Sequence, residues 1–157
     1  MPTATPEQII KTLEIQREIE IAAPIDIVFA SVLEELGPGS QMPDGTPFPM
    51  KIEAWPGGRW YRDLGDNTGH FWGHVQVIKP PTLLEICGPM FMSYPAANFV
   101  QYRLAAQGSG THLKVLHRAL GQITDDHMRG VGEGWAHGIN RIRQIAEQKL
   151  GRNGDRR

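Results

Sequence analysis

The chain has 157 residues, of which 40% are hydrophobic and 21% charged, and its formal net charge is -1. This composition argues against an acidic disordered chain, and the charge balance offers no basic surface for nucleic acid. One domain of this length buries roughly 70% of the surface of its unfolded chain, so we predict a single core. The lone Cys87 allows no intrachain disulfide. The first twelve residues lack the apolar run of a signal peptide, and no later apolar stretch is long enough for a membrane span, so we expect a cytoplasmic protein.

The first predicted element is a strand in EIQREIEIAAP. Ile15, Ile19 and Ile21 occupy alternating positions, and Arg17 falls on the same side. A period of two is typical of a half-buried strand. The strand should end at Pro24, which cannot donate a hydrogen bond to a neighbouring strand.

A short helix and a long loop should follow. Proline suits the first turn of a helix, and IDIVFASVLEEL carries its apolar residues at helical spacing, so the helix should end before Gly37. Residues 37–49 are dense in glycine and proline and show no periodicity. We therefore predict an irregular loop, of a length that is often functional.

The stretch EAWPGGRWY, residues 53–61, places two tryptophans and a tyrosine around a Pro-Gly-Gly turn. Strand-like residues lie on both sides of the turn, so we predict a β-hairpin. A phosphate-binding loop would need the glycines to open a helix. Strand patterns then recur in HFWGHVQVIKPP, TLLEICG, FVQYRLAAQ and THLKVLHRAL, which predicts an antiparallel meander with one covered face.

Alternation within HFWGHVQVIKPP predicts that Phe71 and Val75 share the inner face of the sheet. Trp72 should then point outward, as Phe99 should on a later strand. Exposed aromatic residues on the outer face would indicate a homodimer.

The last predicted element is a helix over residues 125–150, with apolar residues at three- and four-residue steps and Gly151 at its end. Residues 151–157 form a polar tail. Four glycines in the helix each cost roughly 1 kcal/mol relative to alanine: Gly130, Gly132, Gly134 and Gly138. Three explanations stay open: a helix that starts late near Glu133, close approach to the sheet, or space beside a ligand cavity.

This order of elements is that of the α+β helix-grip (START/Bet v-like) fold, a curved antiparallel sheet around a long C-terminal helix. IEIAAPIDIVFASV, GHVQVIKPPTLLEI, GTHLKVLH and GEGW resemble segments of the START-like, polyketide-cyclase (SRPBCC) superfamily. PGGRW resembles the hairpin of its branch related to the activator of the 90-kDa heat-shock protein ATPase. The likeness spans roughly residues 13–150 of a single domain, and it departs at 37–49, where the family commonly carries a tryptophan.

The resemblance implies a cavity between the sheet and the last helix that binds a small hydrophobic molecule. Two alternatives stay open: a protein-interaction module similar to the co-chaperone, and an enzyme similar to polyketide cyclases or dehydratases. The chain carries no nucleophile elbow, nucleotide-binding loop or HExxH motif. A binder without cofactor is therefore the expectation, and an enzyme is the weaker hypothesis.

Five residues are the candidate ligand contacts: Arg17, Trp60, Tyr102, His117 and Trp135. His117 lies on the apolar face of the last strand, where it could orient a ligand, act as a base or bond a core neighbour. Arg17, if it points inward, needs a ligand carboxylate, a structural acid or a route to the sheet's edge. The three aromatic residues could form cavity walls or ordinary core.

Histidine spacing does not predict a metal site. His70 and His74 would lie about 13 Å apart along one strand, too far to share an ion. His112 and His117 would face opposite sides of their strand. We therefore expect no bound metal and assign no catalytic residue.

Overall fold

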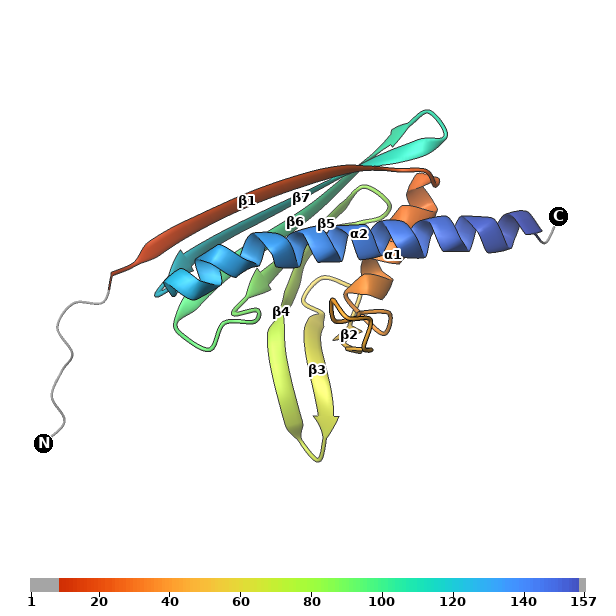
Figure 1. Cartoon of the computed structure of the whole chain (residues 1–157). Helices are drawn as coiled ribbons and strands as arrows, with labels where there is room; N and C mark the ends of the chain where they lie inside the picture. Colours follow the sequence, from red (N-terminus) through yellow and green to blue (C-terminus); the bar gives the residue numbers. More distant parts are fainter. Residues whose placement is uncertain (1–8, 156–157) are drawn as a thin grey trace, which may run out of the picture.

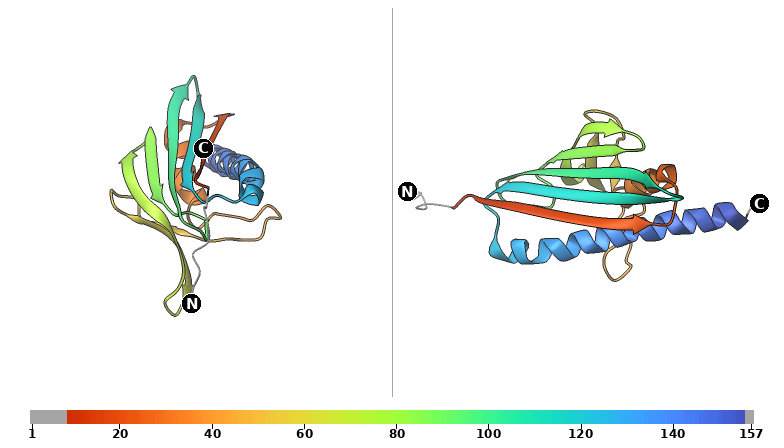
Figure 2. Two further views of the ribbon diagram at one scale, coloured as in Figure 1. Left: turned by 90° about the vertical axis from the view of Figure 1, so that its left-hand side faces the viewer. Right: turned by 90° about the horizontal axis from the view of Figure 1, so that it is seen from above.

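The computed structural model describes residues 9–155 of the chain. This part contains seven strands and two helices. In chain order they are β1 (Lys11–Ile21), α1 (Ile25–Glu35), β2 (Lys51–Ile52), β3 (Arg59–Gly65), β4 (Thr68–Lys79), β5 (Leu83–Gly88), β6 (Ala96–Gln107), β7 (Gly110–Gly121) and α2 (Asp125–Asp155). The strands form one antiparallel sheet in the order β1-β7-β6-β5-β4-β3-β2. Its concave face wraps around α2, which confirms the predicted helix-grip fold (Figures 1 and 2).

The first strand, β1, forms one edge of the sheet and pairs with the last strand, β7. Ile15 lies opposite His117, and Ile19 lies opposite Leu113. Pro24 then starts α1 as predicted, because its backbone carbonyl accepts the first helical hydrogen bond from Val28 at 3.1 Å. The following loop is irregular, with one isolated bridge between Gln41 and Pro47.

A bulge between β3 and β4 corrects the predicted orientation of Trp72. Trp60 pairs with Gly73, whereas Tyr61 pairs with Phe71, so Trp72 is an extra residue between the two pairs. An extra residue reverses the alternation of side chains along the strand. Trp72 is therefore buried, with 7% of its surface exposed, and Phe71 is 42% exposed on the other side.

The last helix begins at Asp125 and continues to Asp155, so both a late start and an end at Gly151 are wrong. Gly151 does not adopt the left-handed conformation that ends helices, and the chain continues through it. The buried residues of α2 begin near the middle of the helix: Ile139, Ile142, Ile145 and Ala146. In residues 125–138 no side chain is fully buried.

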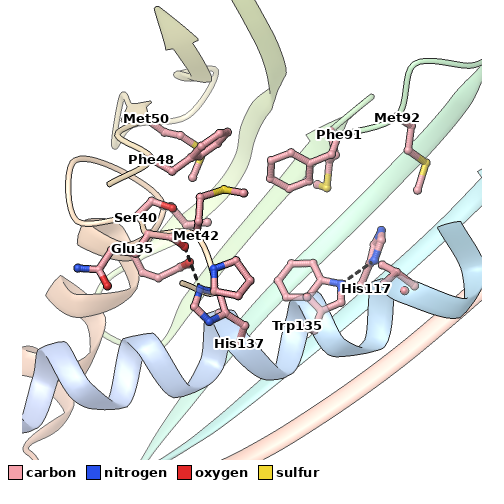
Figure 3. A pocket seen from close by; sticks show the side chains of 18 of the residues that line it. Glu35, Ser40, Met42, Phe48, Met50, Phe91, Met92, His117, Trp135 and His137 are labelled. Atoms are coloured by element: carbon pink, nitrogen blue, oxygen red, sulfur yellow. Dashed lines mark hydrogen bonds between the residues drawn. The ribbon is translucent and has the colours of Figure 1, made fainter. Parts of the chain in front are cut away.

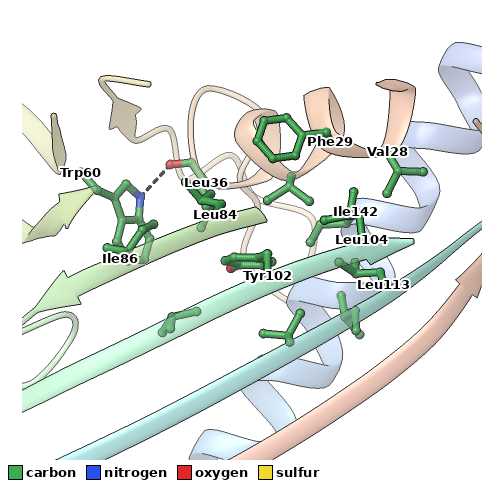
Figure 4. Packing of buried hydrophobic residues seen from close by; sticks show 14 of the residues in the cluster. Val28, Phe29, Leu36, Trp60, Leu84, Ile86, Tyr102, Leu104, Leu113 and Ile142 are labelled. Atoms are coloured by element: carbon green, nitrogen blue, oxygen red, sulfur yellow. Dashed lines mark hydrogen bonds between the residues drawn. The ribbon is translucent and has the colours of Figure 1, made fainter. Parts of the chain in front are cut away.

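The hydrophobic core fills the space between α1, the second half of α2 and the sheet (Figure 4). Phe29 of α1 and Ile142 of α2 belong to the same cluster as Leu84 and Leu113 of the sheet. The core therefore fixes one half of α2 and leaves the other half over a different part of the sheet. Neither described helix is both long and apolar enough to cross a membrane.

Candidate functional site

A cavity of about 660 Å³ lies under the first half of α2. Its other walls are the end of α1, the sheet and two irregular segments, residues 36–50 and 89–95 (Figure 3). Glu35 and Ser40 lie at one end of the cavity, and His117 and Met92 lie at the other. The volume is that of a typical site for a small organic molecule.

Glycines of α2 keep this space open. Gly130, Gly134 and Gly138 are four residues apart, so they share one face of the helix, and all three line the cavity. A Cβ atom added at Gly130 or Gly134 would meet no other atom within 4 Å. Close approach to the sheet therefore does not explain Gly130 and Gly134, which are exposed residues at the border of the cavity, and Gly132 instead faces Arg17.

Methionines make much of the remaining wall. Four of the six in the chain line the cavity: Met42, Met50, Met90 and Met92. All four lie in the two irregular segments. Methionine side chains are unbranched and polarizable, so they can repack around ligands of different shape. Sequence reasoning missed them because segments without periodicity do not reveal which side chains face inward.

His117 is held by hydrogen bonds on both ring nitrogens. The Trp135 indole N–H donates to Nδ1 at 2.9 Å, so Nδ1 carries no proton, and Nε2–H donates to Asn98 Oδ1 at 2.7 Å. Burial, aided by the charge of His127, lowers the pKa of His117 to about 4. Asn98 in turn donates to the Pro89 carbonyl at 3.2 Å. His117 is therefore a neutral structural group with no free lone pair for use as a base.

Three predicted aromatic contacts join His117 around the cavity. Trp60 is buried and donates its indole N–H to the Leu36 carbonyl at 2.7 Å, which ties β3 to the end of α1. The rings of Trp135 and Tyr102 meet edge to face, with centroids 6.4 Å apart. The Tyr102 hydroxyl is buried and has no hydrogen-bond partner among the described residues.

Arg17 is not brought to the cavity. It is exposed on the edge strand β1, and its Nη1 donates to the Gln16 carbonyl at 3.0 Å. Its Nη2 lies 3.0 Å from where a Cβ atom of Gly132 would be. Because β1 is at the edge, the inward side of the strand opens to solvent beside α2, and the long side chain reaches water there.

Glu35 is a cavity residue that sequence reasoning missed. It ends α1, and its carboxylate oxygen lies 3.6 Å from the position of a Cβ atom at Gly138. Burial raises its pKa to about 7, and the charge of Arg141 acts in the opposite direction. The neighbouring Glu34 instead pairs with Lys149 at 2.7 Å. The sequence gives no sign of which of the two glutamates turns inward.

Among the described side chains, residues 9–152, no three of His, Cys, Asp or Glu are grouped so that they could hold a metal ion. The charged residues that line the cavity are Glu35 and Asp126. The site is therefore an apolar pocket with two acidic side chains in its lining.

Comparisons with known proteins agree on the fold. No protein-family model and no curated protein matches the sequence. Among solved structures, CalU16 from Micromonospora echinospora is similar over 92% of this chain and 90% of its own, with a TM-score of 0.58 and 20% identity. DynU16, from the dynemicin biosynthetic locus, has a TM-score of 0.62 and 16% identity over 90% of this chain and 48% of its own.

Ara h 8.0201 is similar over 88% of this chain and 99% of its own, with a TM-score of 0.63 and 14% identity. At identities below 25%, these likenesses establish the fold and not the function. The chain therefore shares the helix-grip fold of these three proteins.

Proposed function

We propose that the protein binds a small hydrophobic molecule in the cavity under α2. The observation that carries this proposal is the open, mostly apolar space of about 660 Å³ beside Gly130 and Gly134. A glycine inside a helix costs roughly 1 kcal/mol relative to alanine, and alanine would meet no neighbour at either position. The helix thus gives up stability where a larger side chain would reduce the space for a ligand.

The proposed contacts are Trp60, Tyr102 and Trp135 as walls, with His117 as a fixed polar group next to Trp135. Arg17 is left out because it lies outside the cavity. The methionines of the two irregular segments would close around the ligand. Aromatic and thioether walls suit a ligand with a ring system or a long apolar chain.

Filling the cavity from the helix tests the proposal. Gly134→Leu places a side chain in the open space and at the same time raises helix propensity, so the protein should stay folded. We expect weaker binding of N-phenyl-1-naphthylamine, a neutral dye that fluoresces in apolar sites. Gly151→Leu is the matched control, because Gly151 also has open space, lies in the same helix and does not line the cavity.

Dye affinity and melting temperature are measured for both variants. The proposal requires a loss of dye affinity in Gly134→Leu without a fall in melting temperature, and unchanged dye affinity in Gly151→Leu. Equal dye affinity in the two variants contradicts it. Native mass spectrometry of the purified protein gives an independent check, since a retained ligand appears as a discrete extra mass.

A second candidate is a protein-interaction module, and one observation favours it. The hairpin of β3 and β4 projects from the body of the sheet and carries exposed Leu64 and Phe71 (Figure 1). Exposed apolar side chains of this kind are typical of contact surfaces, for a chaperone partner or a second copy of the chain. Loss of a specific partner or dimer in Leu64→Ser/Phe71→Ser, with dye binding intact, would support this candidate.

A further inference from the structure

Most polar groups around the cavity already have partners within the protein. The indole N–H groups of Trp60 and Trp135 are bonded to Leu36 and His117. His137 Nε2 is 2.8 Å from the Gln41 carbonyl oxygen. At the mouth, His127 is bonded to Tyr94, and Asp126 is paired with Arg129. The N–H donors of the lining aromatic rings and of His117 are therefore used before any ligand arrives.

The hydroxyl of Tyr102 and the carboxylate of Glu35 are among the lining groups that have no such partner. The Tyr102 side chain is only 1% exposed, and its hydroxyl has no hydrogen bond among the described residues. The Glu35 carboxylate lines the same cavity and forms neither an ion pair nor a hydrogen bond with the side chains described, residues 9–152. The two groups influence each other, because burial and then the charge of Glu35 both raise the pKa of Tyr102.

No lysine or arginine near Glu35 forms an ion pair with its carboxylate among the described side chains. Arg141 of α2 is the nearby cation, but it does not line the cavity, and its Nε donates to the Gly39 carbonyl at 3.3 Å. Lys149 is paired with Glu34. No lysine or arginine is among the cavity-lining residues. A half-buried carboxylate without a partner is stabilised by a ligand that brings positive charge and N–H donors.

We propose that Glu35 and Tyr102 bind the protonated amino group of a hydrophobic amine whose apolar part lies between Trp60, Trp135 and the methionines. This inference rests on the proposed function of the cavity. An ammonium group has three N–H donors, so it offers enough donors for a Glu35 oxygen and the Tyr102 oxygen. The faces of the aromatic rings that line the cavity would add attraction for a cation.

The pH dependence of binding has a definite sign. With the pKa of Glu35 near 7 in the empty protein, its carboxylate is mostly ionised at pH 8 and mostly protonated at pH 5.5. An ammonium binds the ionised form, so its affinity should fall by up to about tenfold per pH unit below 7. Arg141, Tyr102 and His137 are the other titratable or charged side chains at this end. An alkylamine remains protonated over the whole range, so the change reports on the protein.

Three probes that share one apolar part separate the possibilities: 4-phenylbutylamine, 4-phenylbutanol and 4-phenylbutyrate. Calorimetry at pH 8 should give an affinity for the amine at least about tenfold higher than for the alcohol, as expected for a charge-assisted hydrogen bond. The butyrate should bind most weakly. Glu35→Gln should remove the preference for the amine and change the affinity for the alcohol by less than about threefold. Tyr102→Phe should lower amine affinity several-fold.

Glu34→Gln is the matched control, because Glu34 is adjacent, is paired with Lys149 and does not line the cavity. It should leave all three affinities unchanged. Equal binding of amine and alcohol, or an amine preference that survives Glu35→Gln, overturns the inference while the proposed function stands. If no probe and no dye binds, both proposals fail.

Discussion

The ionised side chain of Glu35 should lower the free energy of unfolding of the ligand-free protein at neutral and alkaline pH. Its pKa is about 7 in the folded protein and 4.5 as the ordinary value, so folding favours the protonated carboxyl. A folded-state pKa above the unfolded one gives stability that is fully present below pH 4.5 and is lost as the pH rises through 7. Glu35→Gln removes the charge and keeps the shape, so the variant should be more stable than the wild type at pH 8.

The size of the effect follows from the pKa difference. At about 1.4 kcal/mol per pKa unit, the rise from 4.5 to about 7 corresponds to an advantage of about 3 kcal/mol for the variant at pH 8. The advantage should shrink on acidification and vanish near pH 4.5. His117 acts with the opposite sign, because its lowered pKa gives stability that is lost as the pH falls from 6.5 toward 4. Taking the difference between variant and wild type at each pH cancels the contribution of His117.

Urea unfolding at pH 8, 6.5 and 5, followed by tryptophan fluorescence, measures this difference. Glu34→Gln is again the control, and loss of its partly exposed pair with Lys149 should cost no more than about 1 kcal/mol at any of these pH values. A Glu35→Gln variant that is less stable than the wild type at pH 8 would refute the reasoning. So would an advantage that does not depend on pH.

Three further predictions concern the cavity walls. Tyr102→Phe should change the free energy of unfolding in urea by less than about 0.5 kcal/mol, or raise it, because the hydroxyl that it removes has no partner. A large loss of stability would show that the hydroxyl forms a hydrogen bond. Trp60→Phe should destabilise by at least about 2 kcal/mol in the same assay, because it leaves the Leu36 carbonyl unpaired and a space beside it. Nitrogen NMR should find His117 neutral, with its proton on Nε2, down to about pH 4; a proton on Nδ1 at pH 6 would exclude the Trp135 bond.

The fold could be predicted from sequence because its signals are local. The alternating isoleucines of β1, Pro24 at the start of α1 and the apolar steps of the last helix each report on neighbouring residues. The resemblance to known helix-grip proteins then predicted how these elements are arranged in space, with the sheet curved around the last helix. The inward side of β7 also followed from alternation, which is why His117 was found.

The wrong or missing predictions concern side chains whose position depends on contacts between residues far apart in the sequence. Alternation misplaced Trp72 because the bulge depends on how β3 pairs with β4. Arg17 follows the inward pattern, but the edge position of β1 leaves it in solvent. Glu34 and Glu35 differ by about 100° around the helix axis, and only the packing of α1 against α2 decides which one enters the cavity.

Two independent stability costs coincide at the cavity. Gly130, Gly134 and Gly138 give up about 3 kcal/mol of helix propensity together, and Glu35 is an acid held where its charge is poorly solvated. A domain is stable by only about 5–15 kcal/mol, so these costs are a substantial fraction of the total. A packing defect would explain an empty volume, but it would not explain an unpaired carboxylate facing that volume. A ligand that fills the space and neutralises Glu35 would offset both costs, which is why the ligand hypothesis accounts for more of this site than packing alone.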